Sequence, residues 1–285
     1  MSADTELCPL SWSRQDPERR LMMPAAHYTR VSSFTTGFLA TILTVAVLGG
    51  LLLFKDLWIS QTIWQRGPVP FAIVFFTCWS LMIIFLKWLK LCLQRRALDF
   101  QIVPPTPDFI LSPESVSVVQ NNILDTAEDP QRFILFNRIN IALANLRNLG
   151  RVGDVDEILR SQADNDEGSM ETSYATLRGF VWAIPVLGFI GTVQGLAEAI
   201  GGFGAVLSQS DDLSHVKDAL KGVTGGLSVA FETTLQGLVA ALIVQLLMTS
   251  LKKSEEEFLD RCRAFCTRNV TGKLRLMPFE EPHAE

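Results

Sequence analysis

The chain has 285 residues, of which 48% are hydrophobic and only 19% are charged. Its mean hydropathy is +0.25, a value that argues against an ordinary soluble domain and for a protein that crosses the membrane several times. The formal net charge of −5 does not set the orientation in a membrane, because orientation depends on where the basic residues lie.

The first third of the chain predicts a polar tail followed by two membrane helices. Residues 1–33 are polar and show no helical apolar period, so we expect a flexible or surface-lying cytoplasmic tail. The uncharged stretch Phe34–Phe54 is too long for the core of a cleaved signal peptide and predicts the first transmembrane helix. A second apolar stretch, Phe71–Leu86, extends to about Leu93. These two helices make up the predicted region 34–96.

Basic residues predict the orientation of these helices. Lys87, Lys90, Arg95 and Arg96 close the second helix, and such clusters stay in the cytoplasm. The segment 97–178 is therefore predicted to be a cytoplasmic domain. It contains helical patterns at Gln131–Leu149 and Val155–Gln162, then an acidic run that ends at Gly168. Because it has few apolar positions, it cannot bury much of a core alone, and we expect it to pack as helices that continue from the membrane spans and against neighbouring subunits.

Two further apolar spans, Phe180–Gly204 and Gly222–Ser250, fill the predicted region 179–251 and are joined by a hairpin at 205–221. Lys252 and Lys253 return the chain to the cytoplasm, where 252–285 begins as a charged helix. The predicted fold class is an all-α membrane protein with four transmembrane helices, a helical cytoplasmic insert between helices 2 and 3, and a C-terminal cytoplasmic helix.

The third span carries small residues at helical spacing. Gly188, Thr192, Gly195 and Ala199 recur at intervals of three or four, which places them on one face where another helix can approach closely. Pro185 removes one backbone hydrogen bond and can kink the helix. A helix that faces only lipid needs no such face. We therefore expect the third span to pack on the fourth span, which carries Gly237.

Polar residues mark both spans. If the two helices are antiparallel, Thr192 lies about 18 Å from Phe180 and Thr234 about 16 Å from Val223, so both threonines are expected near the bilayer centre. This geometry predicts an ion pathway at Thr192 and Thr234. The alternative is that each hydroxyl bonds to its own helix backbone.

Glu232 is an acid inside a predicted membrane helix and is therefore a candidate functional residue. It lies about 200° around the helix from Thr234, so the two side chains cannot line the same narrow face. Ser228 and Gln236 share its side, which favours a hydrogen-bonded subunit contact. A titratable role and a structural role both stay open.

The sequence gives little support for an enzyme, a metal-binding protein or a nucleic-acid-binding protein. No nucleophile with a base, zinc-protease motif or phosphate loop occurs, so we expect no enzyme and no cofactor. Cys262 and Cys266 are four residues apart but have no further ligands, so we expect no metal. The five cysteines are interpreted as free thiols in a reducing compartment. No basic, aromatic patch indicates nucleic acid.

The segments PVLGFIGTVQGL (from Pro185) and AFETTLQGL (from Ala230) resemble the paired core of the MotA/TolQ/ExbB proton-channel family. The resemblance implies a homopentamer in the lipid of a bacterial inner membrane, around a dimeric single-span partner of the MotB, TolR or ExbD type that carries a membrane aspartate. Thr192 and Thr234 match the pore-lining positions, and Pro185 matches the kink proline of the flagellar branch. Four spans resemble MotA, whereas Thr192 is the TolQ and ExbB form.

The resemblance implies a channel subunit of a stator-like rotary motor that converts an ion-motive force into work on the cell envelope. The insert shows no charge pattern typical of flagellar rotor binding, so another envelope task is expected. A gated channel or a structural membrane scaffold is the alternative. The sequence leaves open whether the ion is H⁺ or Na⁺ and which process is driven.

Overall fold

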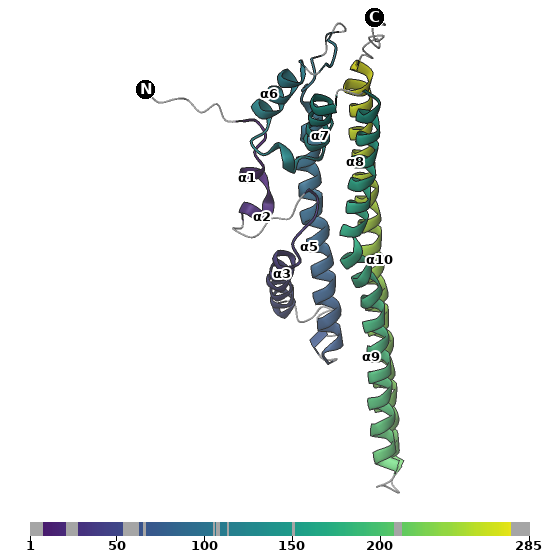
Figure 1. Cartoon of the computed structure of the whole chain (residues 1–285). Helices are drawn as coiled ribbons and strands as arrows, with labels where there is room; N and C mark the ends of the chain where they lie inside the picture. The colour runs from purple at the N-terminus through teal and green to yellow at the C-terminus, as the bar shows by residue number, and fades with distance from the viewer. Residues whose placement is uncertain are drawn as a thin grey trace, which may run out of the picture. The chain divides into compact units, whose positions relative to one another are not determined.

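The computed structural model describes residues 8–20, 28–53, 63–64, 67–104, 106, 109–112, 114–149, 152–207 and 213–274. Within these ranges the regular structure is helical, with two isolated β-bridges and no strand. Four helices are long and apolar enough to cross a membrane. The predicted all-α fold class is therefore confirmed (Figure 1).

The α-helices carry the labels of Figure 1. They are α1 (Trp12–Gln15), α2 (Pro17–Arg20), α3 (Ser33–Leu53), α5 (Val69–Arg96), α6 (Val116–Thr126), α7 (Ile134–Leu149), α8 (Val152–Ser173), α9 (Ala175–Leu207) and α10 (Leu213–Asn269). Short 3-10 helices lie at Ala97–Asp99, Pro130–Arg132 and Thr271–Lys273.

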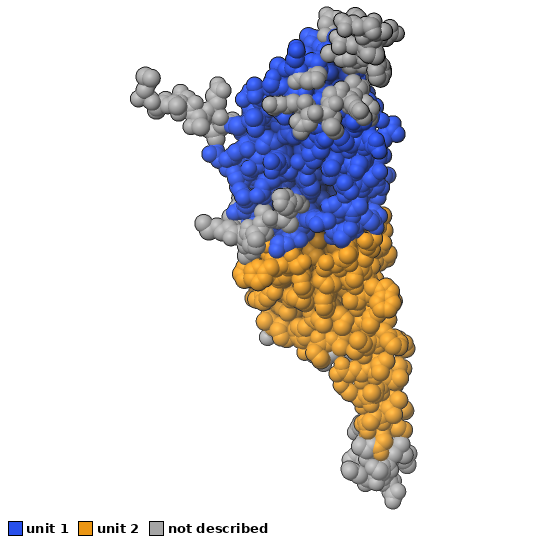
Figure 2. All heavy atoms as spheres, in the orientation of Figure 1, with its two compact units in different colours: residues 1–32, 86–173, 252–285 blue, residues 33–85, 174–251 orange. Residues whose placement is uncertain are grey.

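The chain divides into two compact units (Figure 2). Unit 1 contains Met1–Ser32, Leu86–Ser173 and Lys252–Glu285, and unit 2 contains Ser33–Phe85 and Tyr174–Leu251. Unit 2 thus holds α3, the first part of α5, α9 and the first part of α10. Unit 1 holds α1, α2, α6, α7 and α8 and the remaining parts of α5 and α10.

In unit 2, aromatic and small residues set how α5 packs. The indole Nε1 of Trp79 donates a hydrogen bond to Thr36 Oγ1 of α3 at 3.1 Å. The ring centroid of Phe180, near the start of α9, lies 4.9 Å from that of Trp79. The buried core of this unit is formed by Val69, Ile73, Ile184 and Ala241. Helices α3, α5, α9 and α10 of unit 2 therefore form one packed helical group.

Unit 1 has a hydrophobic core of its own. Leu135, Phe136 and Ile139 of α7 are fully buried, together with Val119 and Ile123 of α6 and Phe258 of α10. Trp12 closes this core, with its ring edge-on to Phe133 at a centroid distance of 5.5 Å. As expected, the insert thus does not form this core alone, because Trp12 of α1 and Phe258 of α10 contribute to it within the same chain, and its contact with neighbouring subunits stays a prediction.

The N-terminal segment is a packed part of unit 1 over residues 8–20. Leu10 exchanges backbone hydrogen bonds with Thr126 and Glu128, each at 3.0 Å, and Trp12 is fully buried. The prediction of a flexible or surface-lying tail is therefore wrong for these residues. A single aromatic residue and buried ion pairs hold this segment in unit 1. It therefore needs no helical apolar period in its sequence.

Two buried lysines of α5 form these ionic contacts. Lys90 Nζ lies 2.6 Å from Glu18 Oε2 and 3.8 Å from Asp16 Oδ1, and it donates to the carbonyl of Arg30 at 2.8 Å. Lys87 Nζ lies 3.2 Å from Glu255 Oε1 of α10. Charges this deeply buried are tolerated only when they are paired. The two lysines therefore fix the N-terminal segment and α10 to one face of α5.

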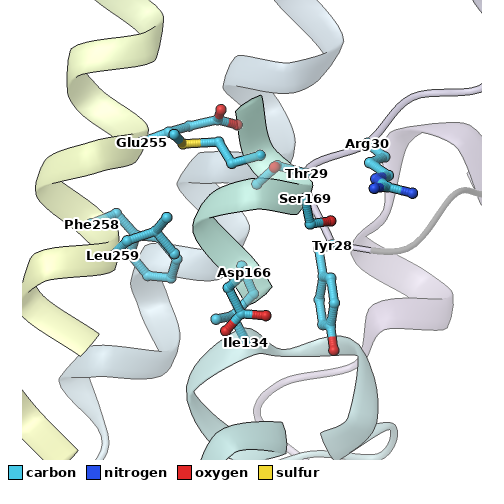
Figure 3. A pocket seen from close by; sticks show the side chains of 10 residues that line it. Tyr28, Thr29, Arg30, Ile134, Asp166, Ser169, Glu255, Phe258 and Leu259 are labelled. Atoms are coloured by element: carbon cyan, nitrogen blue, oxygen red, sulfur yellow. The ribbon is translucent and has the colours of Figure 1, made fainter. Parts of the chain in front are cut away.

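A small cavity lies beside this cluster. It encloses about 10 Å³, which is room for a single water molecule. Figure 3 shows that Tyr28, Asp166 and Glu255 approach it from the N-terminal segment, α8 and α10. Tyr28 adopts a positive φ of 55° and its hydroxyl accepts a hydrogen bond from Asn137 at 2.8 Å.

The helices near the predicted boundaries are longer than the sequence indicated. Helix α8 continues through Gly168 to Ser173, so the expected end at the acidic run is wrong. The hairpin expected at 205–221 is also shorter, because α9 reaches Leu207 and α10 begins at Leu213. Residues 208–212 lie outside the described residues. The charged extension beyond Lys252 is confirmed as a continuation of α10.

Candidate ion pathway

Small residues allow α9 and α10 to pack closely along their length. A Cβ placed on Gly188 would lie 3.1 Å from the carbonyl oxygen of Thr233, and one on Gly237 would lie 3.0 Å from that of Ile184. A Cβ on Gly226 would lie 2.6 Å from that of Ala199. Such contacts are shorter than side chains accept, so backbone nearly meets backbone here.

The contact face of α9 differs from the predicted one at a single position. Gly191 occupies the seam instead of Thr192, since a Cβ on Gly191 would lie 2.7 Å from Thr233 Oγ1. Gly195 faces Gly226 and Ala230, as its small size indicated. On α10 the seam residues Gly226, Ala230, Thr233 and Gly237 follow intervals of four, three and four. That spacing was the signal in the sequence that identifies the second face.

Pro185 lies inside α9, which is helical from Ala175 to Leu207. A proline at this position cannot donate the hydrogen bond of its own turn, so the carbonyl of Val181 loses its helical partner. The neighbouring carbonyl of Ile184 faces Gly237 of α10. The proline therefore lies beside one of the close contacts between the two helices.

The hydroxyl groups of both threonines donate hydrogen bonds to backbone carbonyl groups. Thr234 Oγ1 donates to Gly188 O of α9 at 3.1 Å, whereas Thr192 Oγ1 donates to Phe189 O of its own helix at 2.5 Å. No hydrogen bond joins the two side chains among the described residues. Each hydroxyl oxygen keeps lone pairs that can accept a hydrogen bond from water or from an acid.

The register of the two helices offsets the two threonines along the helix axes. Thr234 lies opposite Gly188, and Thr192 is one turn, about 6 Å, further along α9. Gly191 contacts Val69, the first residue of α5, so α9 continues past α5 for about 24 Å (Figure 1). Contrary to the antiparallel estimate, Thr192 and Thr234 therefore do not lie at the same level of the seam, whereas their place near the bilayer centre stays a prediction.

Each threonine borders an exposed apolar stripe. Thr192 is three residues from Phe189 and four from Leu196. In the same way, Thr234 is three residues from Phe231 and four from Leu238. The stripe on α9 consists of exposed residues at alternating intervals of four and three: Trp182, Val186, Phe189, Val193, Leu196 and Ile200. This is the spacing of a seam that packs against another helix.

Glu232 points to a different side of α10. Its Oε1 accepts a hydrogen bond from Ser228 at 3.2 Å, and it lines a groove with Gln236 and with residues of α3 and α5. The predicted grouping of Ser228, Glu232 and Gln236 on one face is thus observed. The groove lies within the chain, and whether Glu232 contacts another subunit or titrates stays a prediction.

Sequence reasoning missed a second acid in the spans. Glu198 of α9 is exposed and accepts a hydrogen bond from Gln194 at 3.2 Å. It borders a cavity of about 350 Å³ between α9 and α10 that glycines line, including Gly195 and Gly226. The signal was available, since Glu198 interrupts an apolar span in the same way as Glu232.

Comparison with known proteins agrees with this geometry. Residues 127–264 match the family model described as the MotA/TolQ/ExbB proton channel family. The matched range contains α7, α8, α9 and nearly all of α10. The family resemblance seen in the sequence motifs is therefore confirmed. No curated protein and no solved structure matches the chain.

Proposed function

Because residues 127–264 match the model of the MotA/TolQ/ExbB proton channel family, we propose that this multi-pass membrane protein is the channel subunit of a stator-like rotary motor. In this proposal a proton-motive force drives work on the cell envelope, because the matched family is one of proton channels. The ion pathway runs along the stripes that border Thr192 and Thr234. The protein works in the inner membrane with both termini in the cytoplasm.

The observation that carries the proposal is the pair of threonines beside exposed apolar stripes. Thr192 and Thr234 place hydroxyl oxygens where the remaining surface is apolar. A surface that faces only lipid does not require hydroxyl oxygens that accept hydrogen bonds. A helix that carries a protonated aspartate would find acceptors there while its apolar residues pack on the stripes.

The partner is proposed to be a dimer of single-span chains of the MotB, TolR or ExbD type. Five copies of the present chain would surround it, with Gly188, Gly195 and Gly237 keeping each α9 and α10 pair rigid. Ion exchange at the partner's aspartate would turn one ring relative to the other. A short gene beside this one, encoding a single span with an aspartate, is the expected source of the partner.

The test measures proton uptake into vesicles that contain this chain and the partner purified with it. Thr192→Val and Thr234→Val keep the side-chain shape and remove the hydroxyl group. Each variant is expected to lower uptake at least tenfold while the complex still assembles. Thr249→Val is the matched control, because Thr249 bonds to its own helix at Gln245 O and lies outside the proposed pathway.

Unchanged uptake in both valine variants would remove the threonines from the pathway. Absence of uptake in the unaltered complex, with a passive ion leak or none, would favour the gated channel or the scaffold. The yield of intact complex separates these outcomes from a failure to assemble.

A further inference from the structure

A groove in unit 2 runs between α10 and the pair formed by α3 and α5. Its volume is about 590 Å³, within the range of roughly 300–1,000 Å³ that is typical of small-molecule sites. Val47 and Leu51 line it from α3, Val74 and Leu81 from α5, and Val239 from α10. The helices that form the groove are membrane-span candidates, so a ligand would reach it from the lipid.

Two polar side chains on one wall interrupt this apolar lining. Glu232 and Gln236 are one turn apart on α10, and both line the groove. The Oε1 atom of Gln236 is buried and has no hydrogen-bond partner among the described residues. A buried acceptor without a donor costs about 1–3 kcal/mol, so a turn of the Gln236 amide toward a groove occupant that donates a hydrogen bond would be favourable.

We propose that the groove binds lipophilic amines from the membrane. The protonated amine lies between the carboxylate of Glu232 and Oε1 of Gln236, and the apolar chain lies between α3, α5 and α10. The charge of Glu232 selects a cation, and the Gln236 oxygen accepts a second N–H group. A fatty acid or an alkyl sulfate whose chain is as long as that of the amine would place an anion against Glu232, so the groove rejects it.

Only a donor with an apolar body satisfies both features of the groove. Lipid acyl chains alone would leave Gln236 Oε1 without a donor, and water alone would fill a cavity whose walls are mostly apolar. A second copy of the chain would bring its exposed α9 residues, which are apolar over Trp182–Val193 apart from Thr192. Charge complementarity therefore favours the amine.

The experiment titrates the purified full-length protein with dodecylamine and counts bound molecules by native mass spectrometry. The unaltered protein should bind the amine, and Glu232→Gln should weaken binding at least tenfold. Glu198→Gln is the matched control, because it removes the other acid of the spans outside the groove and should bind normally. Val239→Trp fills the groove, leaves both polar groups in place and should also abolish binding.

Several outcomes would overturn the proposal. Equal binding to the Glu232→Gln variant, or equal binding of dodecanol and dodecyl sulfate, would show a site for alkyl chains only. No binding to the unaltered protein, together with cross-linking of Val239→Cys to another copy, would show that a neighbouring subunit fills the groove. Because the readout is binding and not ion flux, these results are independent of the proposed motor function.

Discussion

Single buried charges decide how the N-terminal segment is held. Asp16 is fully buried beside Lys90, and its Oδ1 accepts a hydrogen bond from the backbone N–H of Glu18 at 3.3 Å. Burial raises the pKa of Asp16 above its ordinary value of 3.8, although Lys90 and the Glu18 N–H act in the opposite direction. The folded protein thus holds the Asp16 proton more tightly than the unfolded chain does.

This shift predicts a pH dependence for one substitution. A raised pKa in the folded state gives stability that is complete below pH 3.8 and is lost as the pH rises through the folded-state pKa. Asp16→Asn keeps the acceptor and cannot ionise. Its unfolding temperature relative to the unaltered protein should therefore rise as the pH increases from 3.8 through the range in which Asp16 ionises in the folded protein. An unchanged difference across that range would contradict the assigned cause.

Residues also show why sequence reasoning placed the site only in part. The intervals between small residues identified Gly188, Gly195 and Gly237 correctly as seam positions. They could not distinguish Gly191 from Thr192, because neighbouring positions differ by only 100° around a helix. The hydroxyl of Thr234 reaches a carbonyl of the other helix, and such a contact depends on a register that only packing fixes.

At the scale of elements, the seam between α9 and α10 tolerates no added atoms at one glycine and accepts them at its neighbour. Gly226→Ala would place a Cβ 2.6 Å from that of Ala199, whereas a Cβ on Gly225 would meet nothing within 4 Å. We expect Gly226→Ala to destabilise the protein by about 1–3 kcal/mol. Gly225→Ala should be neutral or stabilising, since alanine favours a helix.

Thermal unfolding followed by circular dichroism in detergent measures this difference. The double variant Gly226→Ala with Ala199→Gly removes the nearest clash and should recover part of the stability. The backbone oxygen of Gly195, 3.0 Å from the added atom, would still limit recovery. Equal melting of the Gly225 and Gly226 variants would show that the helices are not this close.

The N-terminal segment depends on α5 through Lys90. Lys90→Met would leave Glu18 and Asp16 buried without their cation, which we expect to cost about 3 kcal/mol. The segment should then detach, and trypsin should cleave after Arg14 and Arg19 faster than in the unaltered protein. Lys253→Met, at an exposed lysine, is the matched control. Identical cleavage rates in all three proteins would contradict the anchoring role of Lys90.

For the whole molecule, hydropathy and basic clusters predicted four spans and an all-α fold, because a bilayer requires long apolar helices. Hydropathy could not predict which segments of the chain pack together to form unit 1. Its core joins Trp12, Phe133 and Phe258 from three distant parts of the chain. No local pattern encodes such contacts. The distant partners of Lys87 and Lys90 were hidden for the same reason, and these lysines were interpreted only as orientation signals.

The last prediction concerns assembly and follows from the stripe on α9. Its exposed residues include Trp182 at 77% and Phe189 at 64%, and their alternating spacing suits the seam of a second helix better than a lipid surface. On α10, Leu227, Phe231, Leu238 and Leu242 are also exposed. Packing of α9 of one copy on α10 of the next is a head-to-tail contact, and we expect it to close into a ring.

We expect this ring to contain five copies, so the mass of the detergent-purified complex, corrected for bound detergent and lipid, should be five times 31.7 kDa for this chain. Replacing Phe189 and Val193 by glutamate adds charge to the stripe and leaves the α9–α10 seam of Gly188 and Gly195 intact. That double variant should therefore yield separate folded chains with unchanged helix content. A stable monomer or tetramer of the unaltered protein would contradict the pentamer. A pentamer that survives the two charges would show that subunits meet through another surface.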